Sequence, residues 1–247
     1  MKKMKKVLIA LLVITTLSAT AQESVLLRLN YTKGDSFLVT TESNQSRGTQ
    51  GGLNMKMTMG MIVTEVAEEN IKTESMITSV NLEMMQGGMT MSYDSSKKEE
   101  ELDQMGQMMK SQFDPMMEAT IHTTFDNLGN MIDNKIDPPL PGMSQIAANT
   151  NVINYPKEKV SVGSSWTSEK ENQGMTMTTT YTVNGISDGI VSLDVTGNVS
   201  GAGTGTIKGK TLVDISTGIS NSAEIEISIA TQGVDMTMAT NTTISKM

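Results

Sequence analysis

Apolar and polar residues alternate with period two along most of the chain. In the first half the apolar positions are Met55, Met57, Met59, Met61 and Val63, and in the second half Ala223, Ile225, Ile227 and Ile229. This alternation is typical of half-buried strands. Asn184-Gly185 and Asp188-Gly189 are typical turn sequences, and links this short favour antiparallel hairpins because a parallel crossover needs about a dozen residues.

A short sequence pattern occurs once in each half of the chain. Gly34-Asp35-Ser36-Phe37 precedes a Met-x-Met strand, and Gly163-Ser164-Ser165-Trp166 precedes another. Two copies favour a duplicated β unit, because a solenoid needs about three or more copies. We therefore expect a mainly β protein with two related antiparallel curved sheets, arranged as pseudo-duplicated half-barrels. Phe37 and Trp166 should occupy equivalent places in them.

One segment has helical rather than strand periodicity. Its apolar residues are Leu102, Met105, Met108, Met109 and Phe113. Ser96 and Glu99 have the spacing of a capping box, and Pro115 lies where the pattern stops. The sequence predicts an amphipathic helix at about 97–113 that covers an apolar sheet face.

The N-terminus has the features of an export signal at residues 1–21. Four lysines precede a short apolar run, and Ala19-Thr20-Ala21 is a small-residue cleavage site. The remaining chain divides into a first β half at 22–137, a Pro-rich link at 138–155 and a second β half at 156–247. No later stretch approaches the roughly 18 apolar residues of a membrane-spanning helix, so we expect a periplasmic or secreted protein that does not span the membrane.

Composition narrows the classes of partner and site. The chain contains no cysteine, so it has neither disulfides nor a lipid-attachment cysteine. Its formal net charge is −8, and losing the four signal lysines makes it more acidic. An acidic chain with few aromatic residues repels phosphate backbones, so nucleic acid is not an expected partner.

The sequence contains no recognisable catalytic motif. His122 is the single histidine, and it lies in a strand-like run. A triad needs a nucleophile and an orienting acid, which no motif supplies, and no His or Cys cluster offers a zinc site. We expect a non-enzymatic protein with no catalytic residues, no metal site and no cofactor.

Methionine is the unusual feature, with 23 residues in the chain. Flexible thioether side chains suit a surface that accepts varied apolar molecules. The predicted ligand-binding residues are Met55, Met57, Met59, Met61, Met105, Met109, Met175 and Met177. The expected partner is a lipid-like apolar small molecule or the apolar surface of an envelope protein. A structural role in the cell envelope without a ligand is an alternative.

Copper is a second interpretation of the methionines. Thioethers select Cu(I), and a Met-x-Met pair places two sulfurs on one strand face. A site would need sulfurs from a neighbouring strand, with Met89 and Met91 as possible partners of Met55, Met57 and Met59.

The block Tyr155-Pro156, Val160, Gly163 and Ser165-Trp166, after a signal ending in Thr20-Ala21-Gln22, resembles an exported family of unknown function typical of Bacteroidetes. The resemblance implies long antiparallel strands with a Gly-x-x-aromatic segment in each half, and no catalytic residues. The layout also looks like the half-barrel carriers of outer-membrane lipoproteins and lipids, in which a curved sheet encloses an apolar pocket. That likeness is architectural, and a fold does not determine a function.

Overall fold

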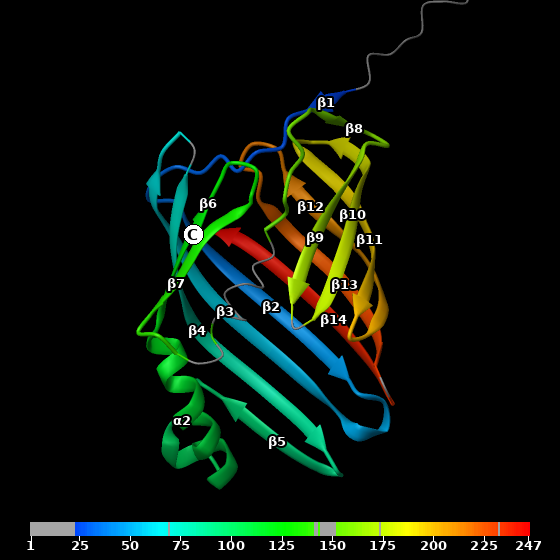
Figure 1. The fold of residues 1–247 in the computed structure, drawn as a ribbon. Helices are drawn as coiled ribbons and strands as arrows, with labels where there is room; N and C mark the ends of the chain where they lie inside the picture. The colour runs from blue at the N-terminus through cyan, green and yellow to red at the C-terminus, as the bar shows by residue number, and fades with distance from the viewer. Residues whose placement is uncertain (1–22, 69, 141–142, 144–151, 173, 232) are drawn as a thin grey trace, which may run out of the picture.

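The computed structural model describes residues 23–68, 70–140, 143, 152–172, 174–231 and 233–247. The predicted signal at 1–21 and most of the link at 138–155 lie outside these residues. Within them the chain forms one large, strongly curved antiparallel sheet (Figure 1). The mainly antiparallel β class is therefore confirmed.

The large sheet has 12 strands in the order β7-β6-β4-β3-β2-β14-β13-β12-β11-β10-β9, with β5 paired to β4. The first-half strands are β2 (Ser36–Ser46), β3 (Gly51–Val66), β4 (Ile71–Gln86), β5 (Met89–Asp94), β6 (Thr120–Phe125) and β7 (Met131–Asp137). The second-half strands are β9 (Ser165–Asn172), β10 (Met175–Ser187), β11 (Ile190–Gly201), β12 (Thr204–Asp214), β13 (Ser220–Thr231) and β14 (Val234–Lys246). A small second sheet pairs β1 (Ser24–Val25) with β8 (Val160–Ser161).

The two turn sequences have different outcomes. Asp188 and Gly189 both have positive φ, 52° and 76°, and form the tight turn between β10 and β11, as predicted. The turn predicted at Asn184-Gly185 is wrong, because these residues continue β10 across a register shift between Val183 and Gly185. A bulge uses the same permissive residues as a turn, so local sequence does not distinguish the two.

The sequence repeat corresponds to the same backbone structure in both halves. Gly34, with φ of 92°, donates its N–H to Val63 O at 2.9 Å, and Val63 N–H donates to Asp35 O at 2.8 Å. The equivalent bonds in the second half, at 2.8 and 2.9 Å, join Gly163, Val183 and Ser164. Positive φ favours glycine at both turns.

The aromatic residues that follow these turns occupy equivalent register positions. Phe37 pairs with Met61, two residues before Val63, and Trp166 pairs with Tyr181, two residues before Val183. Each partner strand then has a register shift, immediately after Val63 and immediately after Val183. Phe37 and Trp166 both contact the same apolar cluster. The repeat is therefore structural, as the sequence predicts.

The halves do not form two separate sheets. β2 of the first half pairs with β14 along ten positions, from Phe37–Lys246 to Ser46–Thr237, and joins the two into one sheet. In strand order, β2-β3-β4-β6-β7 corresponds to β9-β10-β11-β12-β13, so β14 lies between two copies of a five-strand unit. Among the described strands, β7, β5 and β9 are then the edge strands of the joined sheet.

The helix begins and ends later than the sequence predicts. A short 3-10 helix, η2 (Glu99–Glu101), precedes α2 (Gln104–Glu118), so the predicted range of 97–113 is wrong at both ends. Asp103, not Ser96, caps α2, and its Oδ1 accepts from Gly106 N–H at 2.7 Å. Pro115 lies inside the last turn of α2, where its missing N–H removes a single helix bond.

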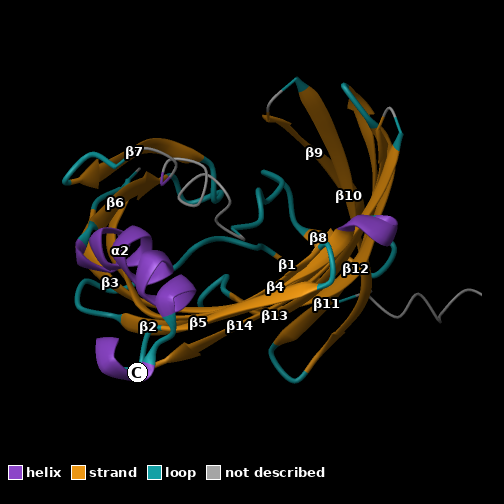
Figure 2. Ribbon diagram, turned by 90° about the horizontal axis from the view of Figure 1, so that it is seen from below, coloured by secondary structure: helices purple, strands orange, loops and turns teal. Residues whose placement is uncertain are grey.

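The helix covers an apolar sheet face, as expected. α2 lies within the curve of the sheet (Figure 2), and we call the face that it contacts the inner face. Met109 and Phe113 of α2 pack with Val80 and Leu82 of β4. The inner face of the first half is therefore packed against α2.

Candidate functional site

The inner face of the second half is apolar but has no helix against it. Its buried floor consists of Val195, Val199, Ile207 and Ile229. Around the floor lie half-exposed Met175, Met177, Tyr181, Ile225, Ile227 and Met236. Every member of this cluster comes from strands β10–β14, so within the described residues the sheet alone forms it. We call this surface the open trough.

Glycines shape the open trough. Gly205 and Gly209 of β12 and Gly197 of β11 occupy inner-face positions in the register. A Cβ at Gly209 would lie 2.1 Å from Glu224 O, and one at Gly205 would lie 2.2 Å from Ser228 O. The strands therefore approach more closely here than any side chain allows. Figure 2 shows β9–β12 turned up from the base of the sheet in this region.

One end of the trough is closed by segments distant in sequence. Residues 27–31 and 152–156, which we call the end plug, pack on Phe37, Val183 and Trp166. Trp166 Nε1 donates to Asn154 O at 2.8 Å. The side chains of Leu27 and Tyr155 are buried, with 0% and 5% exposed. The plug thus lies at the Trp166 end of β9, and Met175 and Met177 lie toward the other end of the same surface.

The end plug also joins the two halves. Leu29 N–H donates to Asn127 O in the first half, and Asn30 N–H donates to Thr217 O in the second, both at 2.9 Å. Tyr155 Oη donates to Gly218 O at 2.8 Å, and burial raises the pKa of this phenol above its usual range. The Tyr155 hydroxyl therefore stays protonated and donates this hydrogen bond.

Charge is nearly absent from the inner face. Among the described strand positions on this face, only Lys170 of β9 and Lys246 of β14 carry a charge. Lys246 Nζ lies 2.6 Å from Asp35 Oδ1 at the plugged end. Lys170 pairs in register with Met177 and has no ion-pair partner in the described part of the chain. The Lys170 side chain is exposed, yet partial desolvation by the neighbouring strands lowers its pKa below the ordinary value.

The predicted methionine site is divided among several clusters. Met57, Met59 and Met109 pack together beneath α2, and Met61 joins the cluster at the end plug. Met175 and Met177 line the open trough. Met55 is half-buried on the same face of β3, and Met105 is half-buried on α2, outside these clusters. The structure therefore brings only Met175 and Met177 into the open trough.

The register places no sulfur directly opposite Met55, Met57 or Met59. Met55, Met57 and Met59 lie opposite Leu82, Val80 and Ile77 of β4. Met89 and Met91 lie on β5, which pairs with β4 rather than with β3. Aliphatic side chains thus occupy the cross-strand positions where a thioether site needs sulfur.

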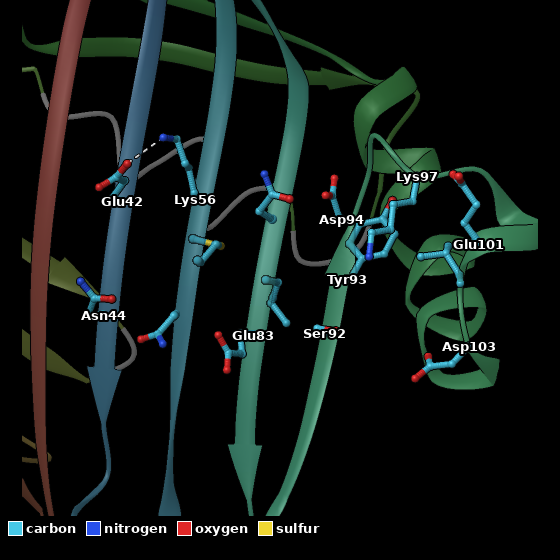
Figure 3. A pocket seen from close by; sticks show the side chains of 15 residues that line it. Glu42, Asn44, Lys56, Glu83, Ser92, Tyr93, Asp94, Lys97, Glu101 and Asp103 are labelled. Carbon is cyan, nitrogen blue, oxygen red and sulfur yellow. Dashed lines mark ion pairs between the residues drawn. The ribbon is translucent and has the colours of Figure 1, made fainter.

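The outer face of the sheet is polar and carries two shallow hollows. The first, about 520 Å³, lies over β2–β5 beside η2 (Figure 3), and the second, about 730 Å³, lies over β11–β14. In the first, Glu42 is paired with Lys56 at 2.8 Å and Asp103 caps α2. Asp94 accepts from Ser96 Oγ at 2.7 Å, which lowers the pKa of Asp94. These carboxylates therefore have local structural partners.

His122 also lies away from the trough. Its Nδ1 is 3.4 Å from Glu74 Oε1, and both side chains are more than 40% exposed. Neither outer hollow includes it. Within the described residues, no group of three or more His, Asp or Glu side chains is arranged to hold a metal ion.

Residues 144–246 match the model of a family of unknown function, DUF6263. This is consistent with the resemblance to an unknown-function family. The match covers the second half, which contains the open trough and Lys170. No curated protein matches the chain.

A solved structure described as "lipid-protein interactions in lipovitellin" is similar to this fold. The TM-score is 0.58 at 10% sequence identity, over 88% of this chain. This chain spans about a quarter of the length of that one, since 25% of it is covered. At this identity the likeness concerns the fold alone.

No helix among the described residues is long and apolar enough to cross a membrane.

The sequence interpretation missed most of the open trough. It identified 223–229 as a strand but did not assign Ile225 or Ile227 to a binding surface. It did not consider Lys170, although the period of two from Trp166 places that lysine on the apolar face. Alternation could have found these residues once the inner face was known.

Proposed function

We propose that this chain is an exported, non-enzymatic protein that binds a lipid-like apolar ligand in the open trough. The observation that carries the proposal is the half-exposed apolar inner face of β10–β14, which no other described element covers. The corresponding face of the first half is packed under α2. The first half shows that a helix can cover an apolar face of this kind. Because the second half leaves its apolar face uncovered, a binding role for that face is favoured.

The physical driving force is burial of apolar surface. Removing about 200 Å² of apolar area from water is worth about 5 kcal/mol before the cost of association. Met175, Met177 and Met236 have flexible side chains that adjust to ligands of different shape. The glycines of β11 and β12 contribute no side chains to this face.

Two further observations support the proposal. The similar solved structure concerns lipid–protein interactions in lipovitellin, which is a fold-level analogy. The N-terminal lysines, apolar run and Ala19-Thr20-Ala21 support export to the periplasm or beyond. An apolar partner protein is the competing occupant of the same face.

A neutral fluorescent probe, N-phenyl-1-naphthylamine, tests the proposal directly. The purified mature chain should raise its fluorescence saturably. Ile227→Asp places a charge in the open trough and should weaken binding about tenfold or more. Ser228→Asp is the matched control, since the adjacent residue lies on the outer face, and it should leave binding unchanged.

Folding and specificity are checked in the same series. Circular dichroism compares the fold of both variants with the parent, and Met177→Gln serves as a milder polar change if Ile227→Asp does not fold. Absence of saturable binding by the parent chain overturns the proposal. Equal loss in Ile227→Asp and Ser228→Asp would place the probe elsewhere and also overturn it.

A further inference from the structure

Lys170 is an isolated cation on an apolar wall. Its register partner is Met177, and the next inner-face residue across the sheet is Val199. The chain has 27 acidic against 19 basic residues, yet no acidic side chain pairs with Lys170 in the described structure. Its neighbours Glu169 and Glu171 fall on the outer face by alternation.

Lys170 and the end plug lie toward opposite ends of the open trough, so the two ends of the trough differ chemically. Trp166 lies against the end plug, and Ser168 Oγ still donates to Asn154 Oδ1 at 3.1 Å. Lys170 is the next inner-face residue of β9 after Ser168, farther from the plug and opposite Met177. The trough therefore has an apolar interior that ends in one positive charge.

We propose that the open trough takes amphiphiles with an anionic head group, the alkyl chain lying on the apolar floor and the head bound by Lys170. This inference rests on the proposed function and specifies its ligand class. A carboxylate or phosphate head would pair with the ammonium, while the tail covers Met177, Ile227 and Ile229. Lys170 is exposed in this structure, although desolvation by the neighbouring strands lowers its pKa. A bound anion would offset this effect by favouring the charged form.

Protection of a sheet edge is the alternative role for Lys170. β9 is an edge strand, and an inward charge discourages pairing with another chain. Either sign of charge serves that purpose, whereas only a cation binds an anionic head. Lys170→Glu therefore separates the two roles.

Competition against the neutral probe tests the inference with dodecanoate, dodecyl phosphate and dodecanol, which share one chain length. In the parent chain, at least one of the two anions should displace the probe about tenfold more effectively than the alcohol. Lys170→Gln should abolish that preference, Lys170→Glu should reverse it, and Lys170→Arg should retain it. Binding of the neutral probe should stay within about twofold in all three variants.

Lys208→Gln is the matched control, because it removes an exposed lysine from the outer face of β12. It should leave the preference for anions intact. Preference for dodecanoate identifies a fatty-acid-like head, and preference for dodecyl phosphate identifies a phospholipid-like head; both support the inference. Unchanged anion preference in Lys170→Gln overturns it while leaving the proposed function in place. If the parent chain does not bind the neutral probe, the proposed function itself fails.

Discussion

The two halves of the sheet are built on one plan and differ in what lies against the inner face. Both begin with the same glycine turn. In each, the aromatic residue after the turn pairs with a residue two positions before a valine of the next strand, and that strand has a register shift just after the valine. In the first half, α2 packs its methionines on the strands. In the second half, the equivalent strands carry half-exposed apolar side chains without a helix among the described residues. The duplicated unit is therefore a scaffold, and the difference between its copies locates the candidate site.

The largest expected effect concerns the close approach of neighbouring strands at Gly209 in the open half. Gly209→Ala should destabilise the protein by about 3 kcal/mol or more, because the new Cβ would lie 2.1 Å from Glu224 O. Gly185→Ala is the control, since no atom lies within 4 Å of its Cβ position. Urea unfolding of both variants measures the difference. Similar stability of the two variants would show that close strand approach at Gly209 does not shape the trough.

A smaller effect should separate the covered and open methionines. Met109→Ala removes a buried side chain beneath α2 and should cost roughly 2–3 kcal/mol of unfolding free energy. Met177→Ala removes a half-exposed side chain from the open trough and should cost about 1 kcal/mol or less. The same unfolding measurement compares them. Equal costs would mean that the second half is packed as fully as the first.

The smallest effect concerns the repeated turn. Thr32 N–H donates to Asp35 Oδ2 at 2.8 Å, and Ser161 N–H donates to Ser164 Oγ at 3.0 Å, so a carboxylate and a hydroxyl have the same role. The hydrogen bond from Lys246, with that from Thr32, lowers the pKa of Asp35. A lowered folded-state pKa adds stability above the unfolded value of about 3.9, and this contribution disappears as pH falls through the folded value.

Asp35→Asn should therefore lower stability at pH 7 by about 1 kcal/mol or less and remove part of the acid sensitivity below about pH 4. Ser164→Ala should lower stability without changing the dependence on pH, since a hydroxyl does not titrate in this range. Thermal unfolding between pH 2.5 and pH 7 compares the two. An unchanged acid profile in Asp35→Asn would contradict the role given to the ion pair with Lys246.

The sequence predicts the strands, the two glycine turns and the presence of the helix, because these features depend on residues close together in the chain. Alternation predicts strands, since successive side chains point to opposite faces. Glycine before Phe37 and Trp166 predicts two similar turns, because φ near 90° favours that residue. The helix was predicted in kind but displaced in position, because several nearby polar residues could cap it and only Asp103 is placed to accept from Gly106 N–H.

The sequence alone does not predict which distant strands pair. The pairing of Thr41 with Thr242 joins the halves across most of the chain, and neither strand carries a local signal for its partner. The same is true of the site. Met57 and Met177 both belong to alternating runs, yet one lies under α2 and the other lines the open trough. Lys170 becomes meaningful only when the curved sheet places it on the apolar face. Periodicity is a property of one segment, whereas curvature, coverage and pairing depend on contacts between distant segments.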